Sequence, residues 1–148
     1  NFTNFMNLIN LLYTPIVESA SRLAAYAGAK GGSYEQVATV DGDEPMLRTY
    51  WQQSIDHIAF ALRSIIASSQ SSPEAVTFTL TEECAEPMRA HAESALATYC
   101  ALSIAAQWLQ LAGAGEQSGY KAEAAALLES VCRSLMLAPT TRGLEPPF

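Results

Sequence analysis

The sequence has few basic residues. Eight Lys and Arg stand against fifteen Asp and Glu, which gives a formal net charge of -7. The cations are scattered along the chain, whereas a nucleic-acid-binding surface needs a cluster of them to neutralise phosphates. We therefore expect no sequence-specific contact with nucleic acid.

The sequence is also poor in metal ligands and in paired cysteines. Its three cysteines, Cys84, Cys100 and Cys132, include no CxxC pair, and its two histidines, His57 and His91, belong to no Glu-x-x-His or His-x-x-x-His motif. Cys100 and Cys132 fall on apolar helical faces, where a free thiol behaves as a small hydrophobic side chain. These patterns predict reduced thiols, no disulfide and no metal site.

Motifs of known catalytic chemistry are missing too. No GxSxG turn accompanies any serine, and Gly28, Gly31 and Gly32 form neither GxGxxG nor a phosphate-binding loop. The chain therefore lacks a recognisable nucleophile, base or cofactor cradle. We predict that it is not an enzyme and that it needs no cofactor.

The longest uncharged stretch runs from Ser94 to Gly115 and is bracketed by Glu93 and Glu116. Its length would suffice for a membrane span. However, polar residues recur through it, and no Lys or Arg lies near either end to set an orientation. We interpret it as a central buried helix and expect no contact with a membrane. The N-terminus shows no basic region followed by an apolar run, so we also expect no secretion.

Hydrophobic periodicity predicts one all-α domain over residues 1–148, a bundle of four to five helices. The second helix gives the strongest signal, because Leu47, Trp51, Ile55, Ile58, Leu62 and Ile65 form a seam at helical spacing. The expected elements are a leading helix at 2–29, core helices at about 43–67, 82–112 and 116–137, and an extended tail at 139–148.

Two prolines leave the helix boundaries open. Pro15 either kinks the leading helix or starts a new one after Thr14, which is a good N-cap residue. Pro87 likewise either kinks the helix that Thr81 begins or marks a second start after Glu86.

The only clear strand signal is the alternation at 76–80, a short strand or β-hairpin segment. A lone strand cannot satisfy its own backbone groups, so it must pair. Three partners are possible: residues 36–40, the same strand of a neighbouring subunit, or another protein. We therefore treat this strand, a tyrosine in the preceding loop and the end of the tail as candidate interaction residues, namely Tyr34, Val76, Phe78, Leu80 and Phe148.

The order of elements resembles the head–tail connector, or head-completion, proteins of tailed phages and prophages. The resemblance covers about residues 41–136. Its four segments are DGDEPMLRTYWQQSIDHIAFALRSII, the strand AVTFTL, ALATYCALSIAAQWLQLAG and YKAEAAALLESVCRSLM. The region before Asp43 and the tail after Pro139 lie outside it.

The resemblance implies a structural virion protein. Copies would assemble as a homo-oligomeric ring between the portal and tail proteins, first in the host cytoplasm and then in the virion. The alternative is a helical adaptor domain that binds a small molecule or peptide without catalysis. In that case we expect the aromatic residues around Trp51 and Trp108 to line a cavity.

Overall fold

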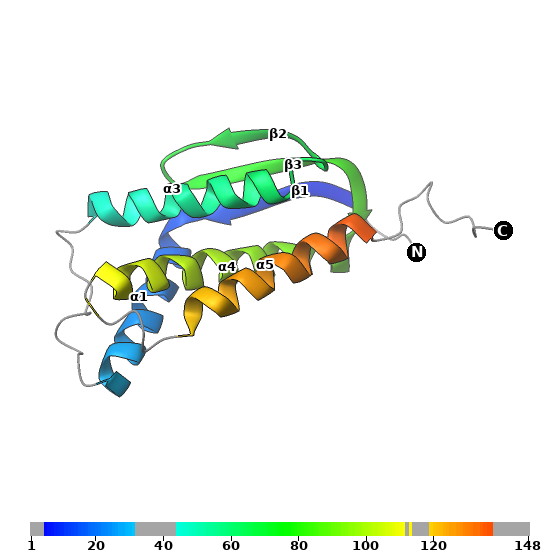
Figure 1. Cartoon of the computed structure of the whole chain (residues 1–148). Coiled ribbons are helices and arrows are strands. Elements are labelled where there is room, and N and C mark those ends of the chain that lie inside the picture. The colour runs from blue at the N-terminus through cyan, green and yellow to red at the C-terminus, as the bar shows by residue number, and fades with distance from the viewer. Residues whose placement is uncertain (1–4, 32–43, 112, 114–118, 138–148) are drawn as a thin grey trace.

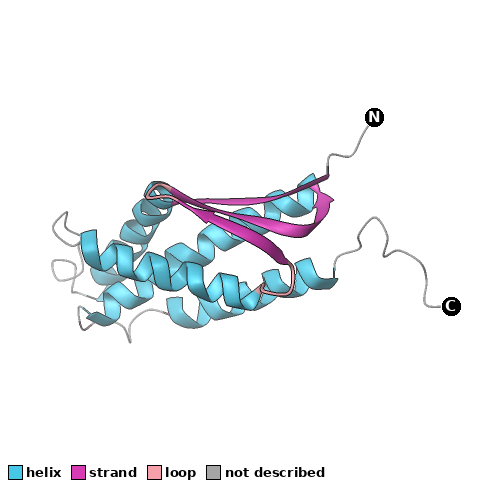
Figure 2. Ribbon diagram, turned by 90° about the horizontal axis from the view of Figure 1, so that it is seen from above, coloured by secondary structure: helices cyan, strands magenta, loops and turns pink. Residues whose placement is uncertain are grey.

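The computed structural model describes residues 5–31, 44–111, 113 and 119–137. Its elements are β1 (Phe5–Leu12), α1 (Tyr13–Gly31), α3 (Glu44–Ala61), β2 (Ile66–Ser71), β3 (Ala75–Ala85), α4 (Glu86–Leu111) and α5 (Tyr120–Leu137). In these residues three strands form an antiparallel sheet in the order β1-β3-β2, and the sheet lies along one side of the helices (Figures 1 and 2).

The prediction of an all-α bundle is therefore wrong, and the fold is mixed, with helices predominating. The strand expected at 76–80 lies within β3, which is longer and has a partner on each side. Two further strands replace the first part of the leading helix and most of the polar break after the second helix. The proposed pairing with residues 36–40 concerns residues outside those that the structure describes.

The sheet has one buried and one open face. Along β1 and β3 alternate side chains are buried, and these inward residues are Ile9, Leu11, Val76, Phe78 and Leu80. Exposed or half-buried residues, including Leu8 and Thr77, occupy the other face. β2 differs, because every residue from Ala67 to Ser71 is exposed. The helices thus cover β1 and β3 but leave β2 uncovered.

Helix α4 occupies the centre of the molecule. It packs against α1, α3, α5, β1 and β3, and its alanines allow those neighbours to approach closely. It begins at Glu86, so Pro87 marks a helix start rather than a kink. Gly113 follows its end at a positive φ of 81°, a conformation that glycine adopts without a steric penalty. No helix in the described part of the chain is long and apolar enough to cross a bilayer.

A tyrosine–arginine cluster joins α1, α3 and the β2–β3 hairpin. The Tyr13 hydroxyl donates a hydrogen bond to Glu44 Oε2 (3.1 Å), and the Arg48 guanidinium lies 3.6 Å from the centre of the Tyr13 ring. Arg48 also pairs with Glu44 (2.9 Å) and donates to the Pro73 carbonyl (2.6 Å). Burial, followed by the bond to Glu44, raises the pKa of Tyr13 to about 12, so the hydroxyl remains a donor at neutral pH.

Candidate functional site

Three of the five sequence-predicted interaction residues lie in the core rather than on the surface. Val76, Phe78 and Leu80 point into the core and are at most 5% exposed. They hold the sheet on the helices, so a partner cannot reach them while the sheet stays in place. Tyr34 and Phe148 lie outside the described residues. The described surface instead offers two kinds of contact region, a groove between helices and the edges of the sheet.

The groove lies between α3, α4 and α5 and has a volume of about 1520 Å³. Helix α4 forms its floor, with α3 on one side and α5 on the other. It is lined by His57 and Ala61 of α3, by Tyr99, Ser103, Ala106, Gln107 and Gln110 of α4, by Gly113 and Gly119, and by Lys121, Ala122, Ala124, Ala125, Leu128, Glu129 and Cys132 of α5.

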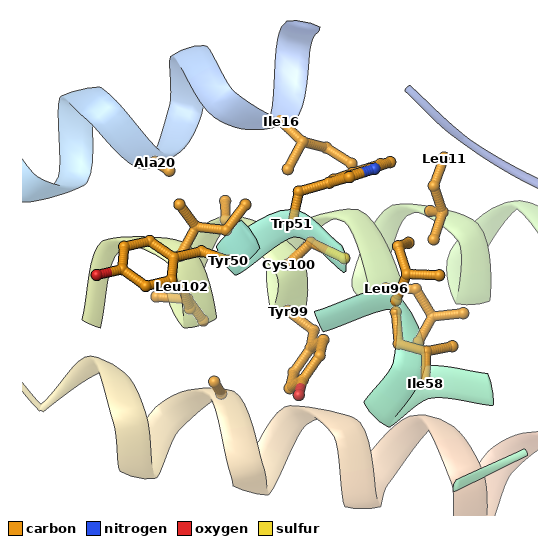
Figure 3. Packing of buried hydrophobic residues seen from close by; sticks show 14 of the residues in the cluster. Leu11, Ile16, Ala20, Tyr50, Trp51, Ile58, Leu96, Tyr99, Cys100 and Leu102 are labelled. Atoms are coloured by element: carbon orange, nitrogen blue, oxygen red, sulfur yellow. The ribbon is translucent and has the colours of Figure 1, made fainter. Parts of the chain in front are cut away.

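The floor of the groove carries a polar stripe. Ser103, Gln107 and Gln110 recur at intervals of four and three residues, so they share one face of α4. Gln107 Nε2 donates to the Ser103 carbonyl and hydroxyl, at 3.4 Å in each case. The Tyr99 hydroxyl lies 3.4 Å from His57 Nδ1, and the ring points toward α5 (Figure 3). Burial raises the pKa of Tyr99, so the hydroxyl stays protonated at neutral pH.

The tryptophans do not line this groove. Trp51 is 4% and Trp108 6% exposed, so both belong to the core. Figure 3 shows Trp51 among the other buried side chains. Trp51 makes an edge-on contact with Tyr13, with the ring centres 5.4 Å apart. The cavity that the adaptor alternative expects around the two tryptophans is therefore not this groove, whose lining instead includes the polar stripe of α4.

The thiols and imidazoles of the described residues do not gather into a metal-binding cluster. Burial raises the pKa of Cys100 and of Cys132, which keeps both thiols protonated at neutral pH. Cys132 lines the groove, and its sulfur lies 3.9 Å from the Ala61 carbonyl. In the described ranges no three His, Cys, Asp or Glu side chains are placed to hold a metal ion together.

The outer edge of β1 is covered by charged side chains of α4. Arg89 Nη1 donates to the backbone carbonyl of Leu8 (3.1 Å), and the backbone N–H of Asn10 donates to Glu93 Oε2 (2.7 Å). Arg89 also pairs with Glu93 (3.0 Å) and with both carboxylate oxygens of Glu86 (2.8 Å each). We call Glu86, Arg89 and Glu93 the edge clamp. It supplies the donor and the acceptor that a neighbouring strand would otherwise provide.

The outer edge of β2 has no such cover from the residues that the structure describes. Its residues are Ser, Ala and Gln after Ile66, and none of them is charged. No side chain in the structurally described residues hydrogen-bonds to Ala67, Ser68, Ser69, Gln70 or Ser71. The two edges of one sheet are thus chemically different.

Comparison with known proteins leaves the resemblance to connector proteins as a prediction. The chain matches no protein-family model, no curated protein and no solved structure.

Proposed function

We propose that the protein is a non-catalytic structural protein that works by docking other proteins, and that its setting is the phage head–tail junction. The observation that carries the docking role is the groove between α3, α4 and α5. Its volume of about 1520 Å³ exceeds the roughly 300–1,000 Å³ that is usual for small-molecule pockets. A groove of this size suits a helix or an extended peptide.

The lining of the groove favours a helix. Small residues on both walls, such as Ala61, Ala122 and Ala125, let a helical backbone approach closely. The polar stripe of α4 offers amide and hydroxyl groups to a polar position of the guest, while Lys121 and Glu129 supply charges of both signs. An amphipathic helix bound along the groove would use the helix-in-groove mode of recognition.

The resemblance suggests which proteins supply that helix. In a connector ring, the guests would be the portal protein, the tail protein or a neighbouring copy of this chain. This assignment places the protein in the host cytoplasm during assembly and in the virion afterwards. The net charge of -7 would suit a ring whose channel lets DNA pass without binding it.

The test compares two variants in which an alanine of α5 is replaced by tryptophan. Ala125 lines the groove, whereas its neighbour Ala126 is also exposed but lies outside the lining. We expect Ala125→Trp to abolish co-sedimentation with the portal protein encoded in the same genome, and Ala126→Trp to retain it. Equal binding by both variants would exclude the groove, and a genome without portal, capsid and tail genes would exclude the connector role.

The second candidate is a ligand- or peptide-binding adaptor outside any virion, which the polar floor of the same groove favours. It predicts a stable monomer or closed dimer whose melting temperature rises when a guest is added, because a guest that binds only the folded state stabilises it. A library of amphipathic peptides, screened by melting temperature against wild type and Ala125→Trp, tests binding in the groove, and the presence or absence of portal, capsid and tail genes in the genome separates this role from the connector role.

A further inference from the structure

The hydrogen-bond register shows which backbone groups of β2 face outward. The Ser72 amide donates to the Ala75 carbonyl (2.9 Å) at the hairpin turn. From there the pairs run Ser71↔Val76, Gln70↔Thr77 and Ser69↔Phe78. Hydrogen-bonded and non-hydrogen-bonded pairs alternate in an antiparallel ladder. The N–H and C=O groups of Ser69 and Ser71 therefore point away from β3.

The β1 side of the sheet supports the same alternation. Asn10 lies opposite Thr77, whose backbone groups turn toward Gln70 on β2. The Asn10 amide must then face the outer edge of β1, and there it donates to Glu93. The edge clamp thus satisfies one amide and one carbonyl on the outer edge of β1, whereas Ser69 and Ser71 on β2 have no side-chain partner among the described residues.

Residues Ser68–Ser71 of β2 carry none of the features that usually protect an edge strand against pairing. Natural edge strands carry charges, prolines or bulges that discourage a second strand. Ile66–Ser71 contains neither a charge nor a proline, and its register shift lies between Ile66 and Ser68. Ser68–Ser71 therefore forms a regular stretch with polar, uncharged and exposed side chains on both faces.

We propose that β2 pairs with β2 of a second copy of this chain, antiparallel and about a two-fold axis, to form a continuous six-stranded sheet. Charge favours this occupant. The neutral stretch 64–73 has Arg63 at one end and Glu74 at the other, and both are exposed. An antiparallel pair brings the Arg63 end of one copy to the Glu74 end of the other, twice. A parallel pair would instead bring like charges together.

The edge clamp explains why the pairing stops at two copies. Each copy has one open sheet edge, and a two-fold contact uses it in both copies at once, so the assembly is closed. The inference goes beyond the proposed docking role and is independent of it, since the groove is lined by no residue of β2. In a ring built from such dimers, the contacts between dimers would use a surface other than the edge of β2.

The first test is sedimentation equilibrium combined with amide hydrogen exchange of wild type. We expect a monomer–dimer equilibrium, with the amides of Ser69 and Ser71 protected at high protein concentration and unprotected at low concentration. A monomer at every concentration up to the millimolar range would overturn the proposal. The open edge of β2 would then be available to a strand of another protein. A dimer whose Ser69 and Ser71 amides exchange freely would also overturn it.

The second test removes the outward N–H alone. Ser69→Pro deletes a donor that the β2–β3 ladder does not use, so the monomer should keep its circular dichroism spectrum. The dissociation constant of the dimer should rise about tenfold or more, because each copy carries the substitution and two hydrogen bonds are therefore lost per dimer. Ser69→Ala is the matched control and should dimerise like wild type. An unchanged dimer in Ser69→Pro would contradict the inference.

The third test reverses the charges at the ends of β2. Arg63→Glu alone and Glu74→Arg alone should each weaken the dimer at low ionic strength, because each places like charges together. The double variant should restore it, and added salt should reduce all these differences. Failure of the double variant to recover would rule out the antiparallel arrangement.

Discussion

The two edges of the sheet show how one protein can close one edge of a sheet and leave the other open. On β1, the edge clamp binds the Leu8 carbonyl and the Asn10 amide. On β2, the equivalent groups of Ser69 and Ser71 have no side-chain partner among the residues that the structure describes. The difference arises because α4 runs beside β1, while no helix of the described residues covers β2. The edge of β1 is closed because another element brings charged side chains to it.

The largest expected effect comes from removing the centre of the edge clamp. Arg89 is only 13% exposed and contacts two carboxylates and a carbonyl. Arg89→Ala should lower the free energy of unfolding by about 2 kcal/mol, because it leaves the Leu8 carbonyl and two nearby carboxylates unpaired. Urea denaturation measures this change. Arg133→Ala is the control, since its pair with Glu129 is exposed, and it should change stability by less than about 0.5 kcal/mol.

Arg89→Ala should also change how the protein associates. With both edges open, contacts can propagate from copy to copy rather than close after two. We expect species larger than a dimer in sedimentation velocity. If the variant is destabilised but no larger species appear, the edge clamp stabilises β1 without guarding it.

A smaller effect is expected at Glu93, which accepts the hydrogen bond of the Asn10 amide at 2.7 Å. Glu93→Ala should lower the free energy of unfolding by about 1 kcal/mol, since it removes that acceptor. Glu93→Gln keeps an acceptor and should lose less. Urea denaturation of both variants tests this order, and equal losses would show that the charge, rather than the bond to the strand, matters.

Acid should weaken the edge clamp. The hydrogen bonds from Arg89 lower the pKa of Glu86, so its ionised form is favoured in the folded state. The stabilisation is fully present above the unfolded carboxyl pKa of about 4.3 and is lost as pH falls through the lowered folded value. The difference in unfolding free energy between wild type and Glu86→Gln should therefore shrink at acid pH. A pH-independent difference would contradict this account.

The smallest effect is expected on β2 itself. Ser71→Ala keeps the backbone donor, and the side chain is exposed. The free energy of unfolding should change by less than about 0.5 kcal/mol, as measured by urea denaturation at low protein concentration. A larger loss would mean that the Ser71 side chain contributes to the hairpin.

The helices were predictable because their signals are local. The seam from Leu47 to Leu62 recurs at helical spacing, and those residues are buried along α3 and just beyond it. Pro87 after Glu86 was one of two starts considered for the helix expected at about 82–112, and α4 begins at Glu86 rather than at 82. Pro139 set the end expected for the last helix at 137. These features depend on residues within one or two turns, so no distant contact is needed to interpret them.

The strands were harder to predict because their signals are ambiguous or absent. Phe5, Leu8, Ile9 and Leu12 fit a helical face, yet the same segment also places Ile9 and Leu11 on one side of a strand. Ile66–Ser71 has little intrinsic strand preference beyond Ile66. Its extended form follows from the β3 ladder and the Ser72–Ala75 turn. The alternation in β3 was visible, but its two partners were not.

The candidate sites depended still more on distant contacts. The sequence contains the polar stripe of Ser103, Gln107 and Gln110. From the sequence alone, these residues argue only against a membrane span, and the structure adds that they line the groove. The edge clamp joins Arg89 to Leu8, 81 residues away, and no spacing rule predicts such a contact.

By itself the sequence determined the acidic surface, the helical propensity of the alanine-rich segments and the position of the central helix. Each of these depends on composition or on neighbours within a few residues. The tertiary structure alone decided that residues 5–12 and 66–71 are strands, which edge of the sheet is closed and where the groove lies. Strand pairing and edge protection join residues far apart in the chain, and a single sequence records no distance between them.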